Sequence, residues 1–234
     1  MLCTMATIAK ERDRTEHRWP AVGSVVFALA LYALLPSSFL PEFRYSVVGV
    51  CLLLLIPVIA INPVRLTKQT RWSRRFSVAL TIVLSIANHI ALVQLIIQLL
   101  QAKKDASGSL LLAAVQVWLT LVVSYALIYW EMDRGGPVVR TTAKRDEMPI
   151  ADIRFPQDED HDAIIEVARG SSAKSDWTAS FVDYAYFALS NSMAFSPPDA
   201  VPLSGRAKIL VGLQALAAYV ILVLVIARAV SLLG

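Results

Sequence analysis

The sequence predicts an all-α, polytopic integral membrane protein, a helical bundle with five or six transmembrane helices. Of its 234 residues 56% are hydrophobic, and the mean hydropathy is +0.58, which is too apolar for a soluble domain with a polar surface. Long apolar runs recur along the chain, and in lipid such runs must satisfy their backbone hydrogen bonds as helices. No segment shows the alternation typical of a membrane β-barrel strand.

Each predicted span follows from its length. A membrane helix needs about 20 apolar residues, because it rises about 1.5 Å per residue and the hydrocarbon is about 30 Å thick. Five stretches are long enough: 19–40, 45–63, 76–100, 110–130 and 209–233. A sixth stretch, 177–195, has only a short apolar middle, because Asp183 lies near one end and Ser190, Asn191 and Ser192 near the other.

The remaining segments complete the domain organisation. We expect an N-terminal tail (1–18), a four-helix transmembrane region (19–130), a hydrophilic loop (131–176) and a C-terminal helical hairpin (177–234). The tail "KERDRTEHR" (10–18) has no small-residue cleavage site after it, so a signal peptide is not predicted. A Gly-Gly-Pro run at 135–137 ends the fourth apolar stretch, because glycine frees the backbone and proline cannot continue a helix.

Basic residues predict the orientation. Sixteen lysines and arginines fall in the tail, the second connection and the long loop, and three fall in the first and third connections. The positive-inside rule then places the N-terminus and the loop in the cytoplasm, in a multi-pass protein of the plasma membrane. Because the net charge of +4 is spread over loops, nucleic acid is not an expected partner. The expected partners are the lipid bilayer, a small ion or solute and, if the chain forms a homo-oligomer, further copies of itself.

Polar residues inside the predicted spans are functional candidates, because burying them in lipid is costly. The third span carries Asn88 and His89, and the fourth carries a four-residue stripe of Gln116, Thr120 and Ser124. These side chains line a hydrated path or a ligand site in one interpretation. In the other they form interhelical hydrogen bonds, worth about 0.6 kcal/mol each. His89 alone is a candidate for haem ligation or proton relay.

Enzyme signatures are absent from the sequence. It contains no glycine-rich phosphate loop, no His/Cys pair at metal-ligand spacing and no G-x-S-x-G elbow. We therefore expect no enzyme activity, no cofactor and no metal. The cluster "QDEDHD" (157–162) offers oxygen ligands for a divalent metal, but its spacing favours a solvated acidic loop.

The C-terminal stretch carries the resemblances. In "DYAYFALSNSMAFSPPDAVPLSGRAKILVGLQ" (183–214), Asp183, Tyr186 and Phe187 resemble the short helix of a two-helix potassium-channel pore domain. Residues 199–204 resemble the turn that follows the filter in that pore domain, and the last apolar stretch through Arg228 resembles its inner helix. The motifs "WEMDRGGP" (130–137) and "MAFSPPDAVPLS" (193–204) are similar to those of a family of uncharacterised actinobacterial multi-pass membrane proteins. That second resemblance covers most of the chain and implies no activity.

The filter position departs from the channel pattern. Aligning on Asp199 puts Ser196 and Pro198 where a potassium filter has glycines, and proline cannot adopt the left-handed backbone that those positions need. We therefore predict no potassium-selective filter. An ion would instead meet the residues of the turn, which are Ser192, Met193, Phe195, Ser196, Pro197, Pro198 and Asp199. For Asp199 two roles stay open, a helix cap or brace of the turn and a charge at a pore mouth.

Segment 177–195 either crosses the membrane or dips in from the cytoplasm and returns. We expect it to cross, because only then does the last helix run in the direction of a channel's inner helix. The predicted function is a channel-like pore or transporter for small ions or solutes, without potassium selectivity. The alternative is a non-transporting membrane scaffold or a bundle that binds a small ligand such as haem or quinone.

Overall fold

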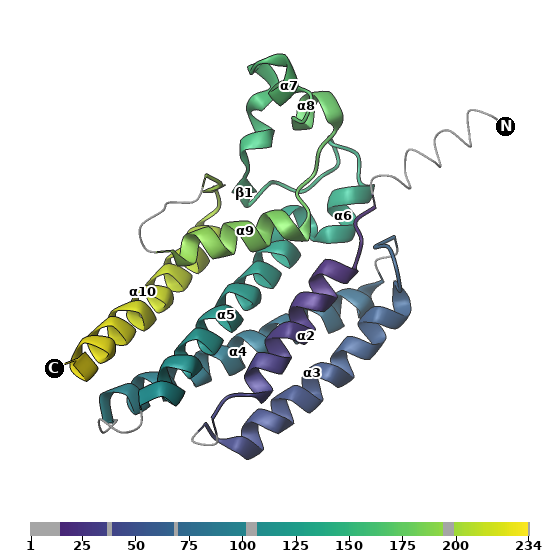
Figure 1. Cartoon of the computed structure of the whole chain (residues 1–234). Helices are drawn as coiled ribbons and strands as arrows, with labels where there is room; N and C mark the ends of the chain where they lie inside the picture. The colour runs from purple at the N-terminus through teal and green to yellow at the C-terminus, as the bar shows by residue number, and fades with distance from the viewer. Residues whose placement is uncertain (1–14, 37–38, 68–69, 102–106, 194–198, 234) are drawn as a thin grey trace.

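The computed structural model describes residues 15–36, 39–67, 70–101, 107–193 and 199–233. Within these ranges the chain is mainly helical, and its β structure consists of two-residue strands. The predicted all-α class is therefore confirmed. The long helices lie side by side in one bundle (Figure 1): α2 (Trp19–Ala33), α3 (Pro41–Ile61), α4 (Arg71–Gln101), α5 (Ser107–Met132) and α10 (Gly205–Leu233).

Four helices of the described ranges, α3, α4, α5 and α10, are long and apolar enough to cross a membrane. The apolar α2 has 15 residues and is shorter than such a span. These helices indicate a membrane protein. A count of five or six spans requires α2 or the segment before α10 as well, and it stays a prediction.

Each of the five long apolar stretches forms a helix, although the ends differ from the predicted ones. Helices α4 and α10 begin at Arg71 and Gly205, several residues earlier than predicted, because their first turns are polar and hydropathy leaves them out. Helix α2 ends at Ala33, well before residue 40. Pro41 lies in the first turn of α3. Proline is tolerated there because the N–H group that it lacks would have no partner within the helix.

Helix α5 is the centre of the bundle. It packs against α2, α4, α10 and the short helix α9 (Phe181–Ser192). In its most apolar window 56% of the residues are buried inside the protein, compared with 22% for α10. Helix α10 therefore has the most surface left for lipid or for another chain.

The hydrophilic loop packs as a small unit on one end of the bundle (Figure 1). Strand β1 (Ile153–Arg154) of this unit pairs antiparallel with β2 (Val201–Pro202), which lies just before α10. The other elements are short: η2 (Asp133–Gly135), α6 (Pro137–Thr142), η3 (Pro156–Asp158), η4 (Asp160–Asp162), α7 (Ile165–Ala168) and α8 (Ser172–Ser175). The loop thus holds the start of the last helix at its own end of the bundle.

The expectation that 177–195 crosses the membrane stays a prediction, and helix α9 alone is too short for it. Helix α9 has 12 residues, or about 18 Å at 1.5 Å per residue, which is well short of the hydrocarbon thickness. Both flanks of α9 contact the same loop, because the Phe155 ring packs on Trp177 at 5.8 Å while β1 pairs with β2. A capping box at Ser180 starts α9 at Phe181, and the polar end of the helix leaves the apolar part short.

Candidate functional site

The end of α5 turns the chain back into the protein. Arg134, Gly135 and Gly136 all have positive φ, at 50°, 78° and 96°. Glycine adopts such angles without strain, and a Cβ on Gly136 would lie 3.2 Å from the Glu131 carbonyl oxygen. This turn places the charged residues of "WEMDRGGP" inside the protein, between α5 and the loop.

Asp133 is the most enclosed acid of this turn, with no exposed surface. One carboxylate oxygen accepts hydrogen bonds from the backbone N–H groups of Asp152, at 2.7 Å, and Ile153, at 3.2 Å. The other accepts from Arg134 Nη1, at 2.8 Å, and from the Tyr184 hydroxyl. Asp133 therefore joins α5 to β1 and to α9.

Arg140 on α6 is the second buried centre, and it is 1% exposed. Its guanidinium donates to the carbonyl oxygens of Ala179 at 2.8 Å, Asp133 at 3.0 Å and Trp130 at 3.2 Å. It also lies over the Tyr184 ring, 4.7 Å from the centroid. One cation thus ties the end of α5 to the segment that enters α9.

Glu16 is the acid nearest to Arg140, at 3.8 Å from Nη2. Its carboxylate accepts hydrogen bonds from Trp130 Nε1, at 3.0 Å, and from the Phe181 backbone N–H. Burial raises the pKa of Glu16 above its ordinary value, and the charge of Arg140 and these hydrogen bonds oppose the rise only in part. Glu16 links the segment before α2 to the same cluster.

Asp152 binds the residues at the start of α10. Its carboxylate accepts from Arg206 Nε at 2.7 Å, Arg206 Nη2 at 2.5 Å and Ser204 Oγ at 2.5 Å, and its carbonyl accepts from Leu203 N–H at 2.8 Å. Burial would raise the pKa of Asp152, but the hydrogen bonds from Arg206 and Ser204 and the charge of Arg206 outweigh it, so the pKa lies below its ordinary value. The Asp152 carboxylate therefore stays charged at neutral pH.

The inner end of α9 meets α10 through a second polar group. Gln214 is fully buried and donates to the Ala188 carbonyl at 2.7 Å and to Ser192 Oγ at 2.8 Å. Its side-chain oxygen accepts from the Tyr129 hydroxyl at 2.8 Å and from Asn191 Nδ2 at 3.0 Å. All four hydrogen bonds are made inside the bundle, where water cannot replace them cheaply.

The residues predicted inside the spans divide between α4 and α5. Asn88 Nδ2 donates to the Val117 carbonyl at 3.0 Å and joins the two helices. The stripe does not join helices through its hydroxyls. Thr120 Oγ1 donates to the Gln116 carbonyl at 2.8 Å and Ser124 Oγ to the Thr120 carbonyl at 2.7 Å, both within α5.

His89 has a neighbour at each ring nitrogen. Nδ1 lies 2.7 Å from the Ser85 carbonyl and Nε2 lies 3.3 Å from the Tyr125 hydroxyl. A haem iron needs one imidazole nitrogen free, so this geometry does not favour haem ligation.

The predicted turn residues are described in part. Phe195, Ser196, Pro197 and Pro198 lie outside the described residues. Ser192 is buried against Gln214, Met193 is 51% exposed and Asp199 is exposed. Ser204 caps α10 instead of Asp199, because its Oγ accepts from Ala207 N–H at 3.2 Å.

The acidic cluster 157–162 has structural contacts. Asp158 accepts from Arg134 Nη2 at 2.6 Å, from Ser172 Oγ at 2.8 Å and from Phe155 N–H at 3.1 Å. His161 pairs with Asp162 at 3.2 Å. Within the described ranges no three His, Cys, Asp or Glu side chains are grouped so that they could hold a metal ion.

Sequence reasoning missed the charges on the loop side of the bundle: Glu16, Asp133, Arg134, Arg140 and Asp152. The motif "WEMDRGGP" was a usable signal, because two consecutive glycines beside paired charges indicate a tight turn that buries them.

Comparisons with known protein families, with curated proteins and with solved structures gave no match.

Proposed function

We propose that this chain forms an oligomeric membrane pore or transporter for small ions or solutes, without a potassium-selective filter. The path follows the α9–α10 hairpin. The loop side of the bundle faces the cytoplasm of a plasma membrane, and α2 is the fifth span.

The geometry of α9 carries this proposal. Helix α9 lies across the loop-side end of α5 and beside α10 (Figure 1), and its inner end is polar at Asn191, Ser192 and Gln214. A short helix that enters and leaves on one side, with a polar inner end, is the arrangement of a re-entrant segment, which membranes tolerate where it is buried in protein or lines a water-filled cavity. In this proposal the cavity lies between copies of the chain that meet at α10, because α10 has the most uncovered surface of the four long candidate spans.

The orientation is tested by cysteine labelling. With the start of α10 held at the loop, 18 lysines and arginines lie on the loop side and four on the other. In a chain without Cys3 and Cys51, Asp162→Cys and Lys208→Cys are expected to resist an impermeant maleimide in intact cells, and Ser231→Cys is expected to react. Membrane permeabilisation is the control, since all three must then react. Labelling of Asp162→Cys and Lys208→Cys from opposite sides would contradict the hairpin.

Transport is tested by flux. Proteoliposomes of the wild-type chain are expected to pass K⁺ and Na⁺ at comparable rates. The Asn191→Leu variant is expected to be about tenfold slower, which corresponds to a barrier about 1.4 kcal/mol higher where the half-buried polar group at the inner end of α9 is lost. Gln101→Leu is the matched control, because Gln101 is exposed at the end of α4. Equal flux in both variants would place the path elsewhere.

A non-transporting scaffold is the second candidate function. The buried network of Asp133, Arg140 and Glu16 favours it, because these charges bind one another and the backbone. Absence of flux from folded wild-type protein in liposomes, with either cation, would select the scaffold.

A further inference from the structure

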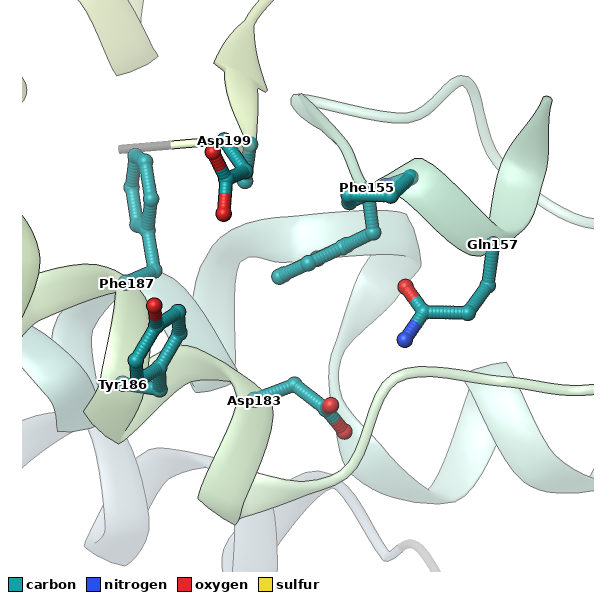
Figure 2. A pocket seen from close by; sticks show the side chains of 8 residues that line it. Phe155, Gln157, Asp183, Tyr186, Phe187 and Asp199 are labelled. Atoms are coloured by element: carbon teal, nitrogen blue, oxygen red, sulfur yellow. The ribbon is translucent and has the colours of Figure 1, made fainter. Parts of the chain in front are cut away.

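A cavity of about 170 Å³ lies between the loop, α9 and the segment that leads to β2. Figure 2 shows the side chains around it, with Asp183 and Asp199 on two sides of the Phe155 ring and with Tyr186 and Phe187 on the α9 wall. The residues that line it are Phe155, Pro156, Gln157, Asp183, Tyr186, Phe187, Asp199 and Ala200.

The cavity has two carboxylates and no basic side chain in its lining. Asp183 uses one oxygen to cap α9, where it accepts from the Ser180 N–H and Oγ, both at 2.7 Å. Asp199 makes no hydrogen bond or ion pair within the described part of the chain. The nearby basic groups are engaged elsewhere, because Arg154 pairs with Glu159 at 2.6 Å and Arg206 with Asp152. The uncompensated charge of the cavity is therefore negative.

Two further polar ends reach the cavity without a partner. The Gln157 amide and the Tyr186 hydroxyl make no hydrogen bond within the described ranges, although both side chains line the cavity. Tyr186 is 61% exposed, which places its ring at the entrance. A ligand that entered here would meet acceptors that the folded chain has left unused.

Aromatic rings make the rest of the wall. Phe155 and Phe187 are buried, and their rings meet edge to face, 6.5 Å apart between centroids. A cation is attracted to the face of an aromatic ring within about 6 Å, and cages of aromatic rings recognise quaternary ammonium groups. The wall is thus suited to a cation that also carries apolar surface.

The size of the cavity selects among cations. A protein cavity of about 150 Å³ accepts benzene, so a cavity of 170 Å³ has room for a group of about six heavy atoms. A bare calcium ion takes six to eight oxygen ligands, and two carboxylates with one amide do not supply them. The dimensions match a small alkylammonium group.

We propose that this cavity binds an organic cation with a methylated or alkyl-substituted ammonium group, with Asp199 and Asp183 supplying charge and Tyr186, Phe155 and Phe187 supplying the aromatic wall. The source of the group is a lipid headgroup or a free solute. The proposal goes beyond transport, since binding at the loop side is independent of any flux through the bundle.

The probe is tetramethylammonium chloride, titrated into the full-length protein in maltoside micelles at low salt and followed by calorimetry. We expect saturable binding that weakens about fivefold or more in Asp199→Asn and in Tyr186→Leu. The matched control Asp162→Asn, whose side chain is 92% exposed, is expected to bind as the wild type does. The neutral isostere tert-butanol is expected not to bind, because it lacks the charge.

Both test residues are exposed, so the variants are expected to keep the wild-type melting temperature. Absence of saturable binding to the wild type, or equal binding to all three variants, would overturn the site. Nanodiscs then identify the source. The ratio of wild-type to Asp199→Asn binding is compared, because it cancels the attraction of the cation to the anionic discs. A smaller ratio in phosphatidylcholine than in phosphatidylglycerol discs supports a lipid headgroup, and an equal ratio in both supports a free cation.

Discussion

Replacing Arg140 with methionine is expected to lower the free energy of unfolding by about 3 to 5 kcal/mol, measured by denaturant titration in mixed micelles. Loss of one partner of a buried ionic network has this cost, because the other charge stays buried without compensation. Here three carbonyl oxygens lose their donor, and Glu16 loses its nearest cation at the same time. Methionine keeps much of the volume, so a cavity contributes little.

The cost of Arg140→Met is expected to depend on pH through Glu16. Its pKa is already raised by burial, and without the Arg140 charge it rises further. A carboxyl whose folded pKa exceeds the unfolded value of about 4.3 stabilises the fold below that value, and this contribution is lost as the pH rises through the folded pKa. The difference between variant and wild type should therefore be smallest near pH 4.

Two variants check the cause. Adding Glu16→Gln to Arg140→Met is expected to restore part of the stability and to remove the extra pH dependence. Arg154→Met is the matched control, because Arg154 pairs with Glu159 at an exposed site, where an ion pair contributes about 0 to 1 kcal/mol. Equal losses from Arg140→Met and Arg154→Met would show that the buried network contributes little.

The helices could be predicted because lipid imposes a length and an apolar composition that hydropathy reads directly. The position of α9 could not. It depends on the Asp152–Arg206 contact, between residues 54 positions apart, and on the pairing of β1 with β2. Each partner taken alone has the sequence of an ordinary polar loop. The polar end of α9 was visible, and it favoured a half-span over the crossing that we expected.

The candidate site was predicted least well where it is most charged. In a membrane a polar residue inside an apolar run stands out, so Asn88 and His89 were identified as candidates. Asp133 and Arg140 follow the fourth apolar stretch in a hydrophilic loop, where exposure is the ordinary state of a charge. Their burial depends on three consecutive positive-φ residues. One of these is Arg134, and its φ of 50° cannot be predicted from composition.

Asp133→Ala is expected to cost about 3 to 5 kcal/mol of unfolding free energy. The N–H groups of Asp152 and Ile153 and the Tyr184 hydroxyl lose their acceptor inside the protein, at about 1 to 3 kcal/mol each, while Arg134 keeps Asp158. Tyr184→Phe removes one of these bonds, to a carboxylate, and should cost about 1.5 to 3 kcal/mol. Asp162→Ala, at an exposed position, should stay within about 0.5 kcal/mol of the wild type.

Because Asp133 holds the backbone of β1, the loss should also spread to the start of α10. Hydrogen exchange is expected to speed up in peptides that cover 152–154 and 201–206, and much less in the middle of α4. In Tyr184→Phe the same peptides should stay protected, because the two N–H bonds of β1 remain. If 201–206 stays protected from exchange in Asp133→Ala, the Asp152–Arg206 ion pair fixes the start of α10 without support from α5.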